Sequence, residues 1–120
     1  MRLALLLAPA VLLAGCAQEH YVQSISVVPN IANTAAAGET VQFQAIANFD
    51  NGITKNITNQ VTWASSTANA ATIDSLGMAT SRCLSGTDTS TVTASLNGSQ
   101  PGLHLHTAVV GQALLTVCHQ

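Results

Sequence analysis

The sequence predicts an all-β protein, an antiparallel β-sandwich of about seven short strands. Three observations favour this fold. Short segments alternate apolar and polar residues, glycine- and asparagine-rich turns separate them, and no segment after the first 16 residues has a convincing helical period. The chain has 120 residues and no internal repeat, so we expect one domain.

The composition excludes some partners. Only 7% of the residues are charged, and the formal net charge is −2. Without Arg2, two basic residues face five acids, which gives a formal charge of −3. No basic patch exists, so we expect no binding of nucleic acid. The recurring β-forming residues also argue against a disordered chain.

The first residues form an export signal. Met1 and Arg2 are followed by an apolar stretch, residues 3–14, which Pro9 interrupts. This stretch is too short to cross a bilayer as a helix, which needs about 20 apolar residues. It fits a secretory signal peptide, but it does not end in the Ala-x-Ala pattern of an ordinary signal. The stretch ends instead in the sequence Leu-Ala-Gly-Cys, residues 13–16.

This ending resembles the lipobox of bacterial lipoproteins. The resemblance implies that residues 1–15 are removed and that Cys16 carries a lipid that anchors the protein in a membrane. Ala17, rather than Asp, follows the cysteine. In a Gram-negative source this favours the outer membrane over the inner one. A plain signal peptide that merely contains a cysteine is the alternative. We expect a lipidated N-terminus and short tether over residues 16–22, and the folded domain over residues 23–120.

The first half of the domain shows the clearest strand patterns. Residues 23–28 alternate and form a half-buried strand, which Pro29 stops or bends onto a second sheet. Residues 40–49 have the cleanest alternation in the chain. A turn at 50–52 follows, and residues 53–59 form either an edge strand or a loop.

The next strand, residues 60–66, carries the single tryptophan. Trp63 shares one face with Val61, which predicts a place in the core rather than a sugar-stacking platform. Further predicted strands cover residues 71–74, 78–81, 91–96 and 107–118, the last with a possible bulge near Gly111. Asn97 and Gly98 predict a hairpin-type turn. The expected core includes Phe43, Val61, Trp63 and Val92.

Two cysteines remain once Cys16 is assigned to the leader. Cys83 and Cys118 form an even pair in an exported chain, which favours one disulfide, with two free thiols as the alternative. Such a bond would stabilise the fold by roughly 3–4 kcal/mol on the chain-entropy model.

The mature chain resembles the group 2 bacterial immunoglobulin-like domain, the Big2 family. The matching pieces are ISVVP at 25–29, GETVQF at 38–43, VTWASS at 61–66, ATID at 71–74 with GMAT at 77–80, GT at 86–87, VTA at 92–94 and LLTV at 114–117. The resemblance implies an immunoglobulin-like, Greek-key sandwich. It also implies a structural, adhesive or protein-binding role in the cell envelope. Extra residues at 81–85 and a long connection at 97–112 depart from the family pattern.

No residue pattern predicts catalysis, so we expect a non-enzyme without a cofactor. The weak metal candidates are His104 and His106, whose spacing places both rings on one face of an extended segment. Zinc needs three or four ligands, so we expect exposed loop histidines there, as for His20 and His119. The scattered acids predict turn-stabilising side chains rather than a calcium site. A metal- or glycan-binding lipoprotein that uses the His104/His106 loop is the alternative function. The expected partners are the membrane and an envelope protein or glycan.

Overall fold

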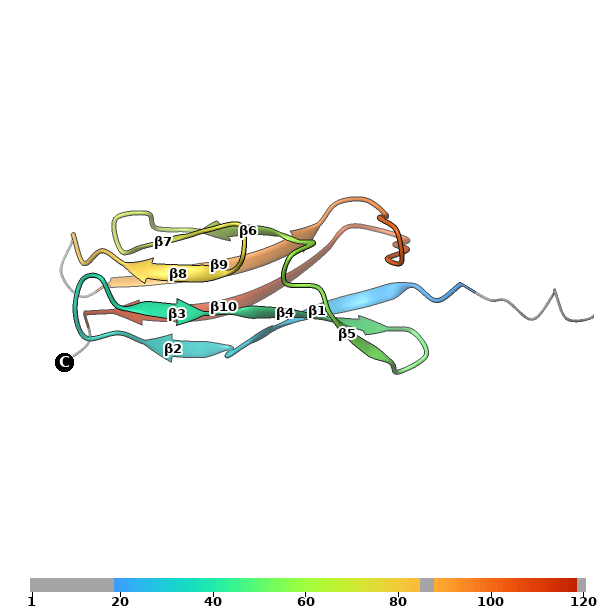
Figure 1. The fold of residues 1–120 in the computed structure, drawn as a ribbon, viewed down its shortest axis with the longest axis horizontal. Helices are drawn as coiled ribbons and strands as arrows, with labels where there is room; N and C mark the ends of the chain where they lie inside the picture. Colours follow the sequence, from blue (N-terminus) through green and yellow to red (C-terminus); the bar gives the residue numbers. More distant parts are fainter. Residues whose placement is uncertain (1–18, 85–87, 119–120) are drawn as a thin grey trace, which may run out of the picture.

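The computed structural model describes residues 19–84 and 88–118, and this part of the chain is an all-β sandwich (Figure 1). Its strands are β1 (Val22–Val28), β2 (Ile31–Asn33), β3 (Thr40–Gln42), β4 (Gln44–Phe49), β5 (Thr54–Asn56), β6 (Thr62–Ser65), β7 (Ala71–Ile73), β8 (Met78–Ser81), β9 (Asp88–Leu96) and β10 (Val109–Val117). These ten strands exceed the predicted seven because β2 and β5 are short and one predicted strand is divided.

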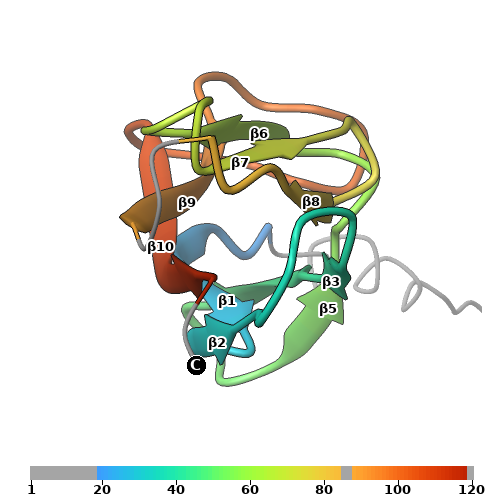
Figure 2. The ribbon, with the colours of Figure 1, turned by 90° about the vertical axis from the view of Figure 1, so that its left-hand side faces the viewer.

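The strands form two layers. One layer is the sheet β2-β10-β9-β6, and the other combines the sheets β1-β4-β5 and β3-β8-β7 through the consecutive strands β3 and β4. Seen along the long axis, β9 and β10 lie across the core from β3 and β8 (Figure 2). The chain crosses between layers after β6 and returns after β8, as in an immunoglobulin-like Greek key.

Pro29 marks the point where the chain changes layers. The peptide bond between Val28 and Pro29 is cis. Before it, β1 pairs antiparallel with β4, and after it, β2 pairs parallel with β10. The predicted bend onto a second sheet is therefore confirmed. The parallel pair corrects the expectation of a purely antiparallel sandwich, and it arises because β2 keeps the direction of β1 after the switch.

The strand predicted over residues 40–49 divides at Phe43. Residues before it pair with β8, and residues after it pair with β1 and β5. The N–H of Phe43 donates a hydrogen bond to the carbonyl of Gly77, 2.8 Å away, just before β8 begins. The alternation still holds across the division, since Phe43, Ala45 and Ala47 are fully buried. The alternation of the sequence thus shows which face of the segment is buried. The strands that pair with it determine where the segment divides into two strands.

The core lies between the layers and is built from the alternating residues. Phe43, Val61, Trp63 and Val92 are all buried. The Nε1–H of Trp63 donates to the carbonyl of Thr58 at 2.9 Å, so its one polar atom has a partner. The other buried apolar side chains are Val22, Ile25, Val27, Ala45, Ala47, Ile57, Ala70, Ala71, Ala79, Ala94, Leu96, Leu103, Ala113, Leu115 and Val117.

The bulge expected near Gly111 is not present. The register between β9 and β10 runs without interruption from Val109↔Leu96 to Val117↔Asp88. Gly111 instead faces β1, where a Cβ atom would come within 2.9 Å of Ile25 Cγ2 and still closer to the Ile25 carbonyl oxygen. The glycine therefore permits close approach of the two layers. The register shift lies in β1, between Val22 and Ser24.

The turn expected at Asn97 and Gly98 is not a tight hairpin turn but the start of a longer loop, which was expected over residues 99–106. Residues 97–108 form one long connection between β9 and β10, and a bridge joins Gln100 to Leu103 inside it. Gly102 takes a positive φ of 80° in this turn, which favours glycine. Leu103 is fully buried, so the connection closes one end of the core.

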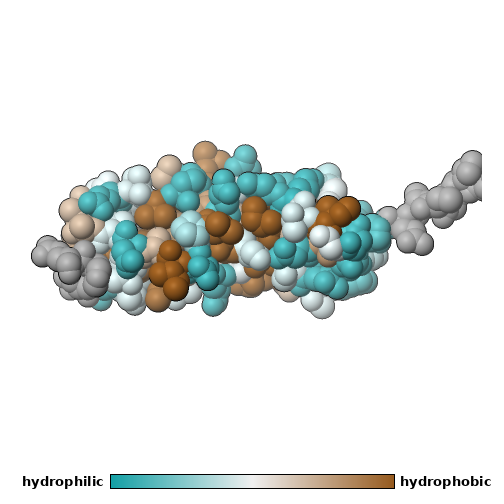
Figure 3. Space-filling view, turned by 90° about the horizontal axis from the view of Figure 1, so that it is seen from below, coloured by the Kyte–Doolittle hydropathy of each residue, from teal (hydrophilic) through white to brown (hydrophobic). Residues whose placement is uncertain are grey.

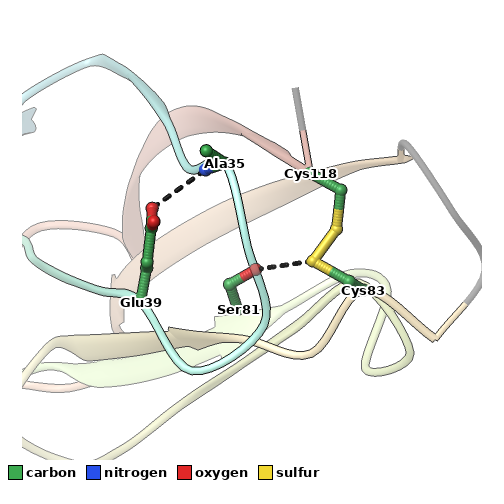
Figure 4. The surroundings of a disulfide bond; sticks show 5 residues. All are labelled: Ala35, Glu39, Ser81, Cys83 and Cys118. Atoms are coloured by element: carbon green, nitrogen blue, oxygen red, sulfur yellow. Dashed lines mark hydrogen bonds between the residues drawn. A yellow bond between two sulfur atoms is a disulfide. The ribbon is translucent and has the colours of Figure 1, made fainter. Parts of the chain in front are cut away.

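The predicted disulfide between Cys83 and Cys118 is confirmed (Figure 4). It joins the segment after β8 to the residue after β10, with the Cα atoms 5.8 Å apart. Ser81 Oγ lies 3.1 Å from Cys83 Sγ, and the hydroxyl is the donor because a disulfide sulfur carries no hydrogen. The bond therefore ties the segment after β8 to the end of the last strand.

Candidate functional site

The most distinctive cluster of polar side chains lies at the end of the sandwich where β1 begins, which we call the entry end. It is formed by residues 19–21, the β4–β5 turn and the 97–108 connection (Figure 1). Backbone hydrogen bonds hold residues 19–21 between the other two segments. The N–H of Val22 donates to His104 O, and the N–H of Asp50 donates to Tyr21 O, each at 2.9 Å. The end of the tether is therefore part of the folded domain.

Three histidines gather at the entry end. His20 Nδ1 lies 2.9 Å from Asp50 Oδ1, and His104 Nδ1 lies 3.9 Å from Glu19 Oε1. The ring of His106 stacks on the ring of Tyr21, with centroids 3.7 Å apart and planes 18° apart. His104 meets the same tyrosine edge-on, at 6.2 Å. Each histidine thus contacts residues 19–21 or belongs to them.

A shallow groove of about 380 Å³ opens at the entry end. Its lining combines the apolar side chains of Phe49 and Ile53 with Lys55 and His104. Phe49 is half-buried and Ile53 is exposed. The groove thus offers an apolar floor with charged groups around it.

The arrangement does not assemble a metal site. Within residues 19–84 and 88–118, no three His, Cys, Asp or Glu side chains lie close enough to share an ion. His104 and His106 meet Tyr21 rather than a third ligand. Asp88 begins β9 at the opposite end of the domain, paired with Val117, and His119 lies outside the described residues.

The acids are placed partly as predicted. Asp74 Oδ1 accepts hydrogen bonds from the N–H groups of Leu76 and Met78, both at 2.9 Å, and so stabilises the β7–β8 turn. Asp50 does not cap its own turn. Its carboxylate contacts His20 instead, and Asn51 Oδ1 accepts the Ile53 N–H at 3.1 Å.

Apolar side chains also reach the outer surface. The face that includes β2 and β5 shows separate apolar patches among polar residues (Figure 3). Ile31 and Leu114 are exposed register neighbours on β2 and β10. Val28 on β1 and Val110 on β10 are exposed as well. These patches are small and scattered, as on many soluble domains.

Sequence reasoning missed the role of His20 and Tyr21. Residues 17–23 carry no periodic pattern, so they read as a tether, and their contacts depend on segments 30 and more than 80 residues away. The burial of Leu103 was missed for the same reason. Cys16, the expected lipidation site, lies outside the described residues.

The comparisons with known proteins add no relative. No family model matches the chain, and no curated protein matches it. In the described part of the chain, no helix has the length and apolarity needed to cross a membrane.

Proposed function

We propose that this protein is a lipid-anchored envelope protein whose immunoglobulin-like domain acts without catalysis, as a structural, adhesive or protein-binding module. One observation carries the proposal. The Leu-Ala-Gly-Cys sequence at residues 13–16 stands six residues before β1, the first strand of the sandwich. A lipid on Cys16 would therefore hold the domain directly at a membrane surface.

The contacts of the polar side chains with one another support a non-catalytic role. The histidines of the entry end contact carboxylates and a tyrosine ring that belong to the same end of the domain. Ser65 and Ser90, two of the more buried hydroxyls, hydrogen-bond to each other at 2.5 Å, and Ser65 also donates to Ala71 O at 2.7 Å. A nucleophile paired with a base would need a different arrangement. The resemblance to Big2 domains agrees with an interaction module, although a fold does not name its ligand.

Replacing Cys16 tests the anchor. The wild-type chain and Cys16→Ser are expressed in a Gram-negative host that is labelled with a radioactive fatty acid, and the cells are fractionated. We expect label and membrane association in the wild type, and an unlabelled, soluble Cys16→Ser protein. A Cys16→Ser protein that stays with the membrane would overturn the proposal, as would a wild type without label. Cys83→Ala with Cys118→Ala is the control, because it removes cysteines but leaves the lipid site intact.

Cross-linking in intact cells tests the interaction role. A photo-reactive amino acid is placed at exposed positions of the two layers, such as Ile31 on β2 and Thr72 on β7. We expect a discrete adduct with an envelope protein or glycan from at least one position. Uniform absence of adducts from every exposed position would contradict a binding module and leave only a structural role.

A further inference from the structure

The entry end carries features that suit a lipid surface, and they point to an orientation of the domain. We propose that the entry end rests on the phospholipid headgroups. The sandwich then stands on the bilayer, and the end that carries the Cys83–Cys118 disulfide points away from it. This inference rests on the proposed lipid at Cys16. It adds a docking surface that anchoring alone does not require, because a tethered domain can also tumble freely.

The length of the tether brings the entry end close to the membrane. Five residues lead from Cys16 to Tyr21. At about 3.3–3.6 Å per residue they span at most about 18 Å. Backbone hydrogen bonds at Tyr21 and Val22 join the end of this segment to Asp50 of the β4–β5 turn and to His104 of the 97–108 connection. The point at which both loops attach therefore stays within about 18 Å of the anchor.

The β4–β5 turn has the chemistry of a membrane-surface contact. Ile53 is 60% exposed although it is large and apolar, and nothing in the folded domain covers that part of it. Lys55 follows two residues later and lines the same groove. An apolar tip beside a long cationic side chain allows shallow insertion, with the ammonium group among anionic headgroups.

Lys55 is the group of the entry end that suits anionic headgroups. The described residues contain one lysine and one arginine, and the lysine lies at this end. The two acids of the end, Asp50 and Glu19, each face a histidine of the same end, at 2.9 Å and 3.9 Å. Lys55 also lies beside the exposed Ile53, so one side chain can insert while the other pairs with a headgroup.

The opposite end is held well away from the bilayer in this orientation. β9 and β10 run the length of the sandwich, with Leu96 paired to Val109 near the entry end and Asp88 paired to Val117 near the disulfide. A nine-residue strand spans about 27 Å between its first and last residues. The disulfide between Cys83 and Cys118 would then point away from the membrane.

Paramagnetic NMR on the whole lipidated protein tests the docking. The protein is placed in nanodiscs of phosphatidylethanolamine and phosphatidylglycerol that contain a lipid with a gadolinium chelate on its headgroup. We expect several-fold larger relaxation enhancement at the amides of Asn51, Ile53 and Gly102 than at those of Gly38, Asn69 and Leu84. Equal enhancement at both ends would overturn the docking and show free tumbling, and larger enhancement along the β2 and β10 surface would show a domain lying flat.

A matched pair of variants tests the contact itself. Ile53→Asp places a charge at the proposed contact, and Leu76→Asp changes a loop residue of similar exposure, 60% against 55%, on the β7–β8 turn. We expect Ile53→Asp to abolish the difference between the two ends and Leu76→Asp to keep it. The proposal would be overturned if both variants, or neither of them, lost the difference in relaxation enhancement between the two ends. Thermal melting shows that each variant is folded.

The experiment separates this inference from the anchor on which it rests. A wild-type protein that fails to enter the nanodisc overturns both the anchor and the docking. A protein that enters the disc without a preferred end overturns the docking and leaves the anchor standing. A preferred end that appears only after envelope proteins are added would assign the surface to a protein partner, and so would overturn the lipid contact.

Discussion

Gly77 lies directly against the indole ring of Trp63. A Cβ atom built on Gly77 would come within 2.9 Å of Trp63 Cζ2 and 2.6 Å of the Phe43 carbonyl oxygen. The same glycine has a φ of 84°, a conformation that other residues rarely adopt. The β7–β8 turn therefore passes over the tryptophan only because this position has no side chain.

We expect Gly77→Ala to destabilise the domain by about 3 kcal/mol, since it combines backbone strain with a clash against the core. Urea unfolding followed by Trp63 fluorescence measures the change. Gly52→Ala is the control, because Gly52 has a φ of 86° but no atom within 4 Å of a new Cβ. It should cost only about 1 kcal/mol. Equal losses in the two variants would show that the contact with Trp63 contributes nothing.

Gly111→Ala tests the close approach of β10 to β1. Its φ is not in the left-handed region, so any loss of stability comes from the contact with Ile25. We expect a loss of about 2 kcal/mol from overpacking, measured by urea unfolding. Gly98→Ala, in open space on the 97–108 connection, should change stability by less than about 0.5 kcal/mol. A neutral Gly111→Ala would contradict the packing that we describe.

The local patterns of the sequence predicted most strands, because alternation depends only on which face of a strand is buried. Trp63 and Phe43 could be placed in the core in this way. Gly111 could not be interpreted correctly, since its role depends on Ile25 in a strand more than 80 residues earlier. A glycine inside a strand fits a bulge and a close contact equally well.

The contacts that form the entry end could not be predicted from the sequence, for a related reason. His104 and His106 were noticed as a pair, but their partners Glu19 and Tyr21 lie in a segment without periodicity. No local signal shows that such a segment is held against a loop 80 residues away. The disulfide could be predicted because counting the cysteines of a chain that the sequence predicts to be exported requires no geometry.

Removing the disulfide should weaken the fold strongly. The bond closes a loop with a sequence separation of 35 residues. We expect the double variant Cys83→Ala, Cys118→Ala to lose about 3–4 kcal/mol, through the greater entropy of its unfolded chain. Urea unfolding gives the value, and the reduced wild type should match the variant closely. Mass spectrometry without reductant must show the wild type two hydrogens lighter than its reduced form, and two free thiols would contradict the bond.

Zinc should not stabilise the domain. The described residues bring no third ligand to His104 and His106, so binding would be weak and would not shift the melting temperature at moderate zinc concentration. Thermal melting of the wild type and His104→Ala with and without zinc checks this. A clear rise in the wild type that His104→Ala abolishes would instead support the metal-binding alternative.

Thr34 carries a hydroxyl without a partner in the interior. Its side chain is 4% exposed, and its Oγ1 has no hydrogen bond, although its N–H donates to Thr116 O at 2.9 Å. Thr34→Val replaces the hydroxyl with a methyl group of similar volume and keeps the backbone bond. We therefore expect a gain of about 1 kcal/mol in the free energy of unfolding, because an unsatisfied polar group is removed.

Ser90→Ala is the matched control for Thr34→Val. Ser90 is equally buried, but its Oγ contacts Ser65 Oγ and accepts the Thr67 N–H at 3.2 Å. Its removal should cost about 1–3 kcal/mol, since it takes a hydrogen-bond partner from the half-buried Ser65 hydroxyl and Thr67 N–H. Urea unfolding of both variants compares the signs. A higher free energy of unfolding in Thr34→Val and a lower one in Ser90→Ala would support the difference between the two hydroxyls. A destabilised Thr34→Val would mean that the Thr34 hydroxyl has a partner, such as a bound water, in solution.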